Sequence, residues 1–241
     1  MQLQDVLFTQ GFGTRRICAG LVQQGHVRVG AQVVTDPAAE LVADGLHFSV
    51  DGVAWEYHQR AYLMLHKPAG LECSSKPSAY PSVYTLLPGP LRLRPQSGGA
   101  VGVQAVGRLD QDTTGLLLLT DDGRFIHRMN SPRRHVPKVY EVTTRHPVDA
   151  AQAGRLLAGV VLDDDPQPVR AAACELTGER QLRLTLTQGK YHQVKRMVAA
   201  AGNRVEGLHR SRIGTLELPA DLAPGQWRWL SDADLAALQP A

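Results

Sequence analysis

The sequence predicts an α+β protein with a small N-terminal domain over residues 1–58 and a larger domain over residues 59–241. A length of 241 residues has room for one large domain or two smaller ones. Short apolar strands are joined by turn dipeptides, which is typical of antiparallel pairing. Helices and strands do not alternate as regular βαβ units, so we expect a mixed, largely antiparallel sheet with helices packed against it.

Two helices and two hairpins are expected within residues 1–58. The apolar run Val6-Leu7-Phe8 opens the first helix, and Thr14 is a suitable N-cap for a second helix that runs to Gly25. Turn signals follow at Gly30-Ala31 and at Asp51-Gly52, each between two short apolar runs. These runs predict the strands of the two hairpins.

The larger domain is expected to begin with a strand at Tyr62–Leu65. A segment rich in Pro, Gly, Arg and Ser follows over Pro88–Gly99, and this composition predicts a mobile surface loop. Further strands are expected at Val136–Thr144, 180–187, Val205–Leu208 and Gly214–Leu218, and helices after Asp122 and Asp149, over Gln193–Ala201 and from Ser231.

Positive charge is clustered along a chain that is only mildly basic. The formal net charge is +3 and the sequence pI is near 8.9. The clusters include Arg15-Arg16, Arg133-Arg134 and Lys195-Arg196. A solvated surface explains each pair taken singly, whereas together they favour a face that binds phosphate groups.

The three cysteines Cys18, Cys73 and Cys174 are widely spaced and form no CxxC pair. This spacing argues against a metal site and a disulfide framework. We therefore expect reduced thiols in a cytoplasmic protein. No apolar run approaches the ~20 residues of a membrane span, and the first residues lack a signal-peptide pattern.

The run from Gly107 to Gly115 carries the strongest sign of chemistry. It places Asp110 two residues after Arg108 in a polar segment bracketed by glycines, and Leu116–Leu119 follows as an apolar run. A loop that feeds a buried strand is a rigid place to present a reactive group. A purely structural Asp110 that accepts hydrogen bonds from loop amides is the alternative.

This run resembles the catalytic-aspartate signature of the pseudouridine synthases that modify ribosomal RNA. Three other segments match motifs of the same family in the same order, namely His66–Gly70, Lys138-Val139-Tyr140 and Gly189–Met197. Four separated motifs are far more specific than one. Residues 1–58 resemble the S4-type RNA-binding domain, although Met1–Asp5 replaces the family's usual Arg-Leu-Asp opening.

The resemblance implies an active site built from three residues. Asp110 is the catalytic nucleophile, Lys195 is its cationic partner and Tyr140 stacks on the target base. The family more often has arginine in the place of Lys195, and a lysine lacks the bidentate fork of arginine. Taken without the resemblance, Lys195 is a surface charge and Tyr140 a packing residue.

The resemblance also implies contacts to RNA. Arg108 is suited to fill the gap left by an extruded base, and a salt bridge within the loop is its alternative role. Val194 is expected to form an apolar wall of the pocket. Phosphate or RNA contacts are expected from the basic residues Arg15, Arg16, Arg28, Lys67, Arg133, Arg134, Lys190 and Arg196.

The predicted function is the isomerisation of one uridine to pseudouridine in small-subunit (16S) ribosomal RNA. The reaction implies neither a cofactor nor a metal, and we expect a monomer whose partner is ribosomal RNA, with no association with membranes. Two alternatives remain, a sister synthase acting on large-subunit (23S) RNA and a non-catalytic RNA-binding factor for ribosome assembly. The second leaves the joint presence of Asp110, Tyr140 and Lys195 unexplained.

Overall fold

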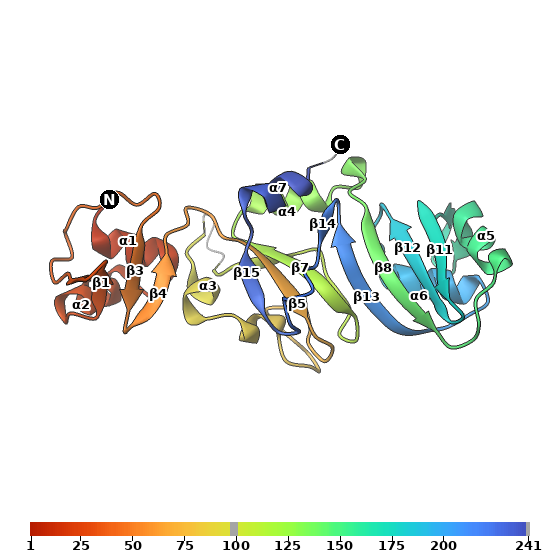
Figure 1. Ribbon diagram of the computed structural model, residues 1–241, viewed down its shortest axis with the longest axis horizontal. Helices are drawn as coiled ribbons and strands as arrows, with labels where there is room; N and C mark the ends of the chain where they lie inside the picture. Colours follow the sequence, from red (N-terminus) through yellow and green to blue (C-terminus); the bar gives the residue numbers. More distant parts are fainter. Residues whose placement is uncertain (97–100, 240–241) are drawn as a thin grey trace. The chain divides into compact units, whose positions relative to one another are not determined.

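A computed structural model describes residues 1–96 and 101–239 of the chain (Figure 1). These residues form two compact units. The first unit contains Met1–Tyr62, Thr85–Gln104 and Leu119–Asp122, and the second contains Leu63–Tyr84, Ala105–Leu118 and Gly123–Ala241. The boundary after residue 58 stays a prediction. None of the described helices is long and apolar enough to cross a membrane.

The two N-terminal helices of the first unit begin and end close to the predicted positions. Helix α1 spans Leu3–Gln10 and α2 spans Arg15–Gln23. The Thr14 hydroxyl accepts a hydrogen bond from the Ile17 amide at 3.3 Å, which confirms the predicted cap. The buried core residues of this part are Leu3, Val6, Leu7, Cys18, Val22, Val27, Phe48 and Val50.

Both predicted hairpins are present in a four-stranded sheet of order β2-β1-β3-β4. Asp51 and Gly52 have φ values of 52° and 78° between the paired residues Val50 and Val53, as a two-residue hairpin turn requires. The strands are β1 (Val27–Val29), β2 (Gln32–Val33), β3 (His47–Val50) and β4 (Val53–Glu56).

The expected mobile loop over Pro88–Gly99 is wrong for the residues that the structure describes. Residues Gly89–Leu93 form helix α3, and the side chains of Leu91 and Arg94 are buried. Residues 97–99 lie outside the described part of the chain. The Pro- and Arg-rich composition did not indicate that this segment packs against the protein through the side chains of Leu91 and Arg94.

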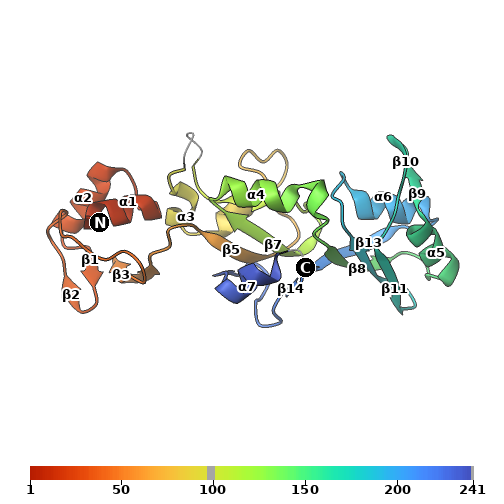
Figure 2. The same ribbon diagram turned by 90° about the horizontal axis from the view of Figure 1, so that it is seen from above.

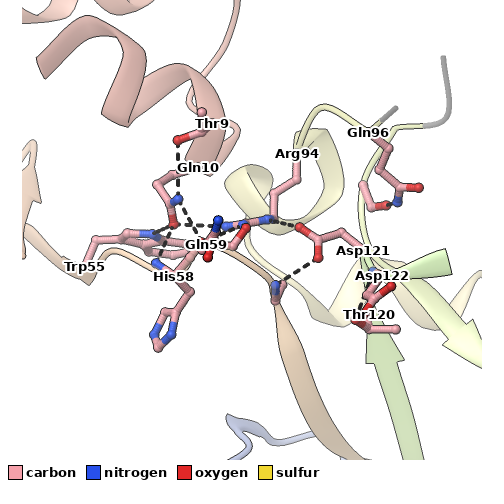
Figure 3. A network of polar contacts seen from close by, with 12 residues as sticks. Thr9, Gln10, Trp55, His58, Gln59, Arg94, Gln96, Thr120, Asp121 and Asp122 are labelled. Atoms are coloured by element: carbon pink, nitrogen blue, oxygen red, sulfur yellow. Dashed lines mark hydrogen bonds and ion pairs between the residues drawn. The ribbon is translucent and has the colours of Figure 1, made fainter. Parts of the chain in front are cut away.

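Arg94 is the centre of a buried polar network in the first unit (Figure 3). Its Nε donates to Asp121 Oδ2 at 2.8 Å, its Nη1 to Gln10 Oε1 at 2.9 Å and its Nη2 to the His58 carbonyl at 2.7 Å. Asp121 also accepts a hydrogen bond from the Ala61 amide at 2.9 Å. The guanidinium therefore joins three segments that are distant in the sequence.

The second unit contains most of a nine-stranded sheet whose main path is β11-β12-β8-β13-β7-β5-β15. Its strands are β5 (Tyr62–Lys67), β6 (Gln104–Val106), β7 (Thr114–Thr120), β8 (Lys138–Thr144), β11 (Ala173–Gly178), β12 (Gln181–Leu186), β13 (Val205–Ile213), β14 (Leu216–Glu217) and β15 (Trp227–Trp229). β13 and β7 run parallel, whereas β13–β8, β8–β12, β12–β11 and β5–β15 are antiparallel. The predicted mixed, largely antiparallel sheet is confirmed.

One long strand replaces the first of the two short strands expected near the C-terminus. β13 continues from Val205 through Leu208 to Ile213, because its polar second half still pairs with β8. Only Leu216–Glu217 of the second expected strand is extended. The strands of the hairpin β9 (Val160–Leu162) and β10 (Asp165–Val169) were not predicted.

Helices cover the sheet of the second unit on both faces. α4 (Gly123–Asn130) and α7 (Asp232–Ala237) lie on opposite sides of it (Figure 2). α5 (Ala150–Ala158) and α6 (Gln193–Ala200) share a core with Leu182, Leu184 and Leu186 of β12. Predicted caps are confirmed at Asp149 and Ser231. Short 3₁₀ turns, η1 and η2, occur at Val83–Leu86 and Pro132–Arg134.

Candidate active site

Two glycines fix the ends of the aspartate loop. Gly107 and Gly115 have φ values of 70° and 111°, a region that side chains other than glycine rarely adopt. A Cβ atom on Gly115 would lie 2.3 Å from the carbonyl oxygen of Arg210. Gly115 therefore allows β7 to approach β13 closely, and this contact sets where the loop leaves the sheet.

The buried side chain of Lys67 binds the backbone of the aspartate loop from the protein interior. Its Nζ donates to the carbonyl oxygens of Pro68, Gln111 and Thr113 at 3.0, 3.2 and 2.9 Å, and its side chain is fully buried. Burial lowers the pKa of this lysine. The predicted phosphate contact is wrong for Lys67, since the ammonium group is enclosed by the loop that carries Asp110.

Asp110 has a partner on each carboxylate oxygen. Lys195 Nζ lies 3.1 Å from Oδ2, and His192 Nε2 lies 3.3 Å from Oδ1. The ion pair expected between Asp110 and Lys195 is therefore present. Lys195 comes from α6, and His192 immediately precedes that helix in a left-handed conformation with φ 48°. The carboxylate is fixed in orientation by two side chains from one short segment.

Lys195 also binds Asp112, at 2.6 Å from Oδ1. Burial opposes the charge on Lys195, but hydrogen bonds to Asp112 and Asp110 outweigh it and raise the pKa of the lysine. Burial likewise opposes the charge on Asp112, and the Lys195 hydrogen bond outweighs it and lowers the pKa of that carboxyl. A compact ammonium with three donors suits a position between two carboxylates.

These residues lie in a cavity of about 1300 Å³. Tyr140 lines it from β8, where the strand register places this residue opposite Arg210 of β13. Arg210 is opposite Gly115 of β7, so the sheet brings the tyrosine strand and the aspartate loop to the same cavity. Tyr140 is half-buried and also packs against the core beneath α6.

Two further cations, Arg210 and Lys138, line the cavity. Arg210 is 1% exposed, and its Nε donates to the Leu116 carbonyl at 2.8 Å. Lys138 lines the cavity two residues before Tyr140 in β8. Burial, together with the charge of Arg210, lowers the pKa of Lys138 to about 8.

Replacing Lys138 by methionine is expected to stabilise the fold at pH 7 by about 1–3 kcal/mol, because the folded state disfavours the charge. The pKa of Lys138 is about 8 when folded, against 10.5 for an ordinary lysine, so the unfolded chain binds more protons between these values. The advantage of Lys138→Met must therefore shrink as pH rises from 8 to 10.5. Urea unfolding across this range measures it, with Lys76→Met at an exposed lysine as the control. An advantage that stays constant with pH would contradict this account of Lys138.

The other predicted site residues are placed as follows. Arg108 is exposed on the cavity wall, and Val194 is buried in the α6 core and also reaches the cavity. Lys190 lines the cavity, whereas Arg196 forms an ion pair with Asp164. The remaining predicted contacts are exposed on the protein surface, namely Arg15, Arg16, Arg28, Arg133 and Arg134.

Two residues at the carboxylate were not singled out from the sequence. Asp112 lies in the same polar run as Asp110, and His192 lies in the same motif as Lys195. The sequence spacing of these two residues is the same as would be expected for polar residues exposed to solvent, so it gives no sign of a role in the site. Only the loop geometry and the left-handed backbone at His192 bring them to Lys195 and Asp110, respectively.

Comparison with known proteins assigns this architecture. The profile described as RNA pseudouridylate synthase matches residues 61–200, which is more than half of the chain. The chain belongs to this family. Residues 1–44 match the S4 domain, so the resemblance of the N-terminal residues to that RNA-binding module is confirmed.

Relatives of this pseudouridine synthase match it over nearly the whole chain. Ribosomal small subunit pseudouridine synthase A of Escherichia coli (strain K12) is 39% identical over 236 residues, covering 97% of this chain and 98% of the relative. The protein of the same description from Pasteurella multocida is 41% identical and covers 88% and 85%. A crystal structure of a pseudouridylate synthase is 32% identical, with a TM-score of 0.68 and 99% coverage of both chains.

The geometry of this synthase suits chemistry led by a carboxylate. Lys195 places a cation 3.1 Å from Asp110 Oδ2, and this carboxylate lines the cavity. The synthase is an RNA-modifying isomerase, as the sequence predicted. The individual roles of its side chains stay predictions.

Proposed function

We propose that this synthase converts one uridine of small-subunit (16S) ribosomal RNA to pseudouridine, with Asp110 as the nucleophile. The observation that carries the proposal is a carboxylate held on both oxygens, by Lys195 and by His192, inside a cavity lined by cations. A carboxylate that is oriented by two side chains and lies beside a cation is a competent nucleophile.

The reaction balances within the substrate. The bond from the ribose carbon to uracil N1 breaks, the base turns, and a new bond forms from that carbon to uracil C5. C5 loses a proton and N1 gains one, so no electron acceptor or donor is needed. Asp110 supplies an electron pair to the sugar or the base to allow the base to detach, and the bond that it forms breaks again when the product is released. Lys195 balances the charge of Asp110 in the resting site.

Access to the base requires that the uridine leave its stack in the RNA. Tyr140 on the cavity wall offers a flat face for the extruded base, and Arg108 is exposed where its planar guanidinium can take the vacated place. The S4 domain carries Arg15, Arg16 and Arg28 on its surface, and these cations support binding of RNA outside the cavity.

The small ribosomal subunit is proposed as the source of the substrate because relatives that match almost the full chain are named for it. Mapping pseudouridine in ribosomal RNA from cells with and without this protein tests the proposal. One uridine of 16S RNA is expected to lose its modification and to regain it when the gene is restored.

The same map separates the alternatives. A site lost from large-subunit RNA would assign the protein to the sister activity on 23S RNA and overturn the proposed substrate. A complete and unchanged map, together with retained RNA binding, would favour a non-catalytic assembly factor. Restoring the gene with Asp110→Asn must fail to restore the lost modification if the mechanism is right.

A further inference from the structure

An aromatic pair, Tyr191 and His192, lies beside Asp110, and its outer member, Tyr191, has no part in the chemistry proposed above. The rings of Tyr191 and His192 are stacked, with centroids 3.8 Å apart and planes inclined by 22°. Both residues line the cavity, and Tyr191 exposes 71% of its surface. A large flat ring of the cavity lining is thus presented to solvent.

The segment that carries the pair is fixed by contacts on both sides. His192 contacts Asp110 at 3.3 Å through Nε2, and the Tyr191 carbonyl accepts a hydrogen bond from Arg196 Nη1 at 3.2 Å. The side chain of Gln193 accepts a hydrogen bond from the Lys190 amide at 2.8 Å. The tyrosine ring therefore rests on a preorganised support, and little ordering is required when a ligand stacks on it.

The surroundings favour a nucleobase as that ligand. The cavity volume of about 1300 Å³ exceeds the roughly 300–1,000 Å³ typical of a pocket for one drug-sized molecule, so it has room for neighbours of the target nucleotide. Arg108, Lys138 and Lys190 line the same cavity and suit the phosphates of such a strand. Cations beside exposed aromatic rings are the usual means of holding single-stranded nucleic acid.

We propose that Tyr191 stacks on an unpaired base that flanks the target uridine, with His192 as the fixed layer beneath it. The positions of the two rings relative to Asp110 favour a flanking base, rather than the target uridine, as the base that Tyr191 contacts. His192 contacts Asp110 through its edge atom Nε2, whereas Tyr191 lies one ring further away, against the face of His192. The inference rests on the proposed action on RNA and assigns Tyr191 to substrate binding.

Two substitutions in the full-length synthase test the role of the ring. Tyr191→Leu keeps an apolar side chain but removes the flat face, and Tyr191→Phe keeps the face and removes the hydroxyl. Tyr191→Leu is expected to raise KM for the RNA about 5- to 100-fold, with much less effect on kcat. Tyr191→Phe is expected to stay within about twofold of wild type in both constants, because stacking needs only the ring.

An abasic RNA series identifies the stacked base. Each nucleotide flanking the target is replaced in turn by an abasic one, and the dissociation constant is measured. One position is expected to weaken binding to wild type by about the factor seen for Tyr191→Leu, and to leave the binding of Tyr191→Leu unchanged. This loss of additivity is the sign of a direct contact.

The outcomes separate this inference from the proposed function. An absence of turnover by wild type on the mapped 16S fragment would overturn the proposed substrate, and the abasic series on any RNA that binds would still test the stacking. Turnover by wild type with an unchanged KM for Tyr191→Leu would overturn the stacking alone. A fall in kcat at constant KM would place Tyr191 in support of Asp110 through His192 and would equally overturn it.

Discussion

Replacing Asp110 by asparagine is expected to abolish turnover, lowering the rate of isomerisation by about 10³-fold or more while RNA binding persists. Asparagine has nearly the same shape as aspartate but lacks the negative charge, and its amide oxygen is a far weaker nucleophile. Lys195 keeps a carboxylate partner in Asp112 at 2.6 Å, so the substitution does not leave the lysine without an ion-pair partner. Tritium release from ribosomal RNA labelled at uridine C5 measures turnover, and a filter-binding titration measures affinity.

Asp112→Asn is the matched control, because Asp112 shares Lys195 with Asp110. It removes the same charge at a more exposed position, so turnover is expected to stay within about tenfold of wild type. If Asp112→Asn removed activity and Asp110→Asn did not, the nucleophile would be assigned to the wrong carboxylate. Near-normal turnover by both variants would overturn the mechanism.

The largest expected loss of stability follows from replacing Arg94 by methionine. The side chains of Arg94 and Asp121 are 2% and 4% exposed, so the variant leaves Asp121 as a buried carboxylate without its cation (Figure 3). Breaking a buried ion pair on one side costs about 3–5 kcal/mol. Gln10 and the His58 carbonyl lose a donor at the same time. Urea unfolding at neutral pH measures the change.

Arg92→Met provides the control from helix α3, which Arg94 directly follows. Arg92 is exposed in α3, two residues before Arg94, and its loss is expected to change the free energy of unfolding by no more than about 0.5 kcal/mol. Combining Arg94→Met with Asp121→Asn should cost less than the sum of the single changes, since the second removes the stranded charge. Additive losses would show that the two side chains do not stabilise the fold as a pair.

Local sequence patterns predicted the parts of this fold that depend on neighbouring residues. Thr14, Asp149 and Ser231 each accept a hydrogen bond from an amide three residues later, so a short window of sequence contains the whole cap. The turn at Asp51-Gly52 is equally local. The pairing of Asp110 with Lys195 joins residues that are distant in the sequence, and it was expected only through the resemblance between motifs.

Features that depend on distant partners were missed. The Arg94 guanidinium bonds to residues 27, 36 and 84 positions away, and no local pattern distinguishes it from the arginines of a solvated loop. Lys67 was expected to contact phosphate, yet its ammonium group is buried and donates to three carbonyl oxygens. His192 reaches Asp110 through a left-handed backbone that the sequence does not reveal.

The enclosure of Lys67 makes this residue a chemical reporter on the aspartate loop. Amine-reactive reagents attack an unprotonated, accessible amine, and the Lys67 amine is reached only when the carbonyls of Gln111 and Thr113 move away. Exposed Lys76 is acylated from the native state and serves as the reference for reagent strength. The rate at which Lys67 acquires the label, followed by mass spectrometry, therefore measures how often the loop that carries Asp110 opens.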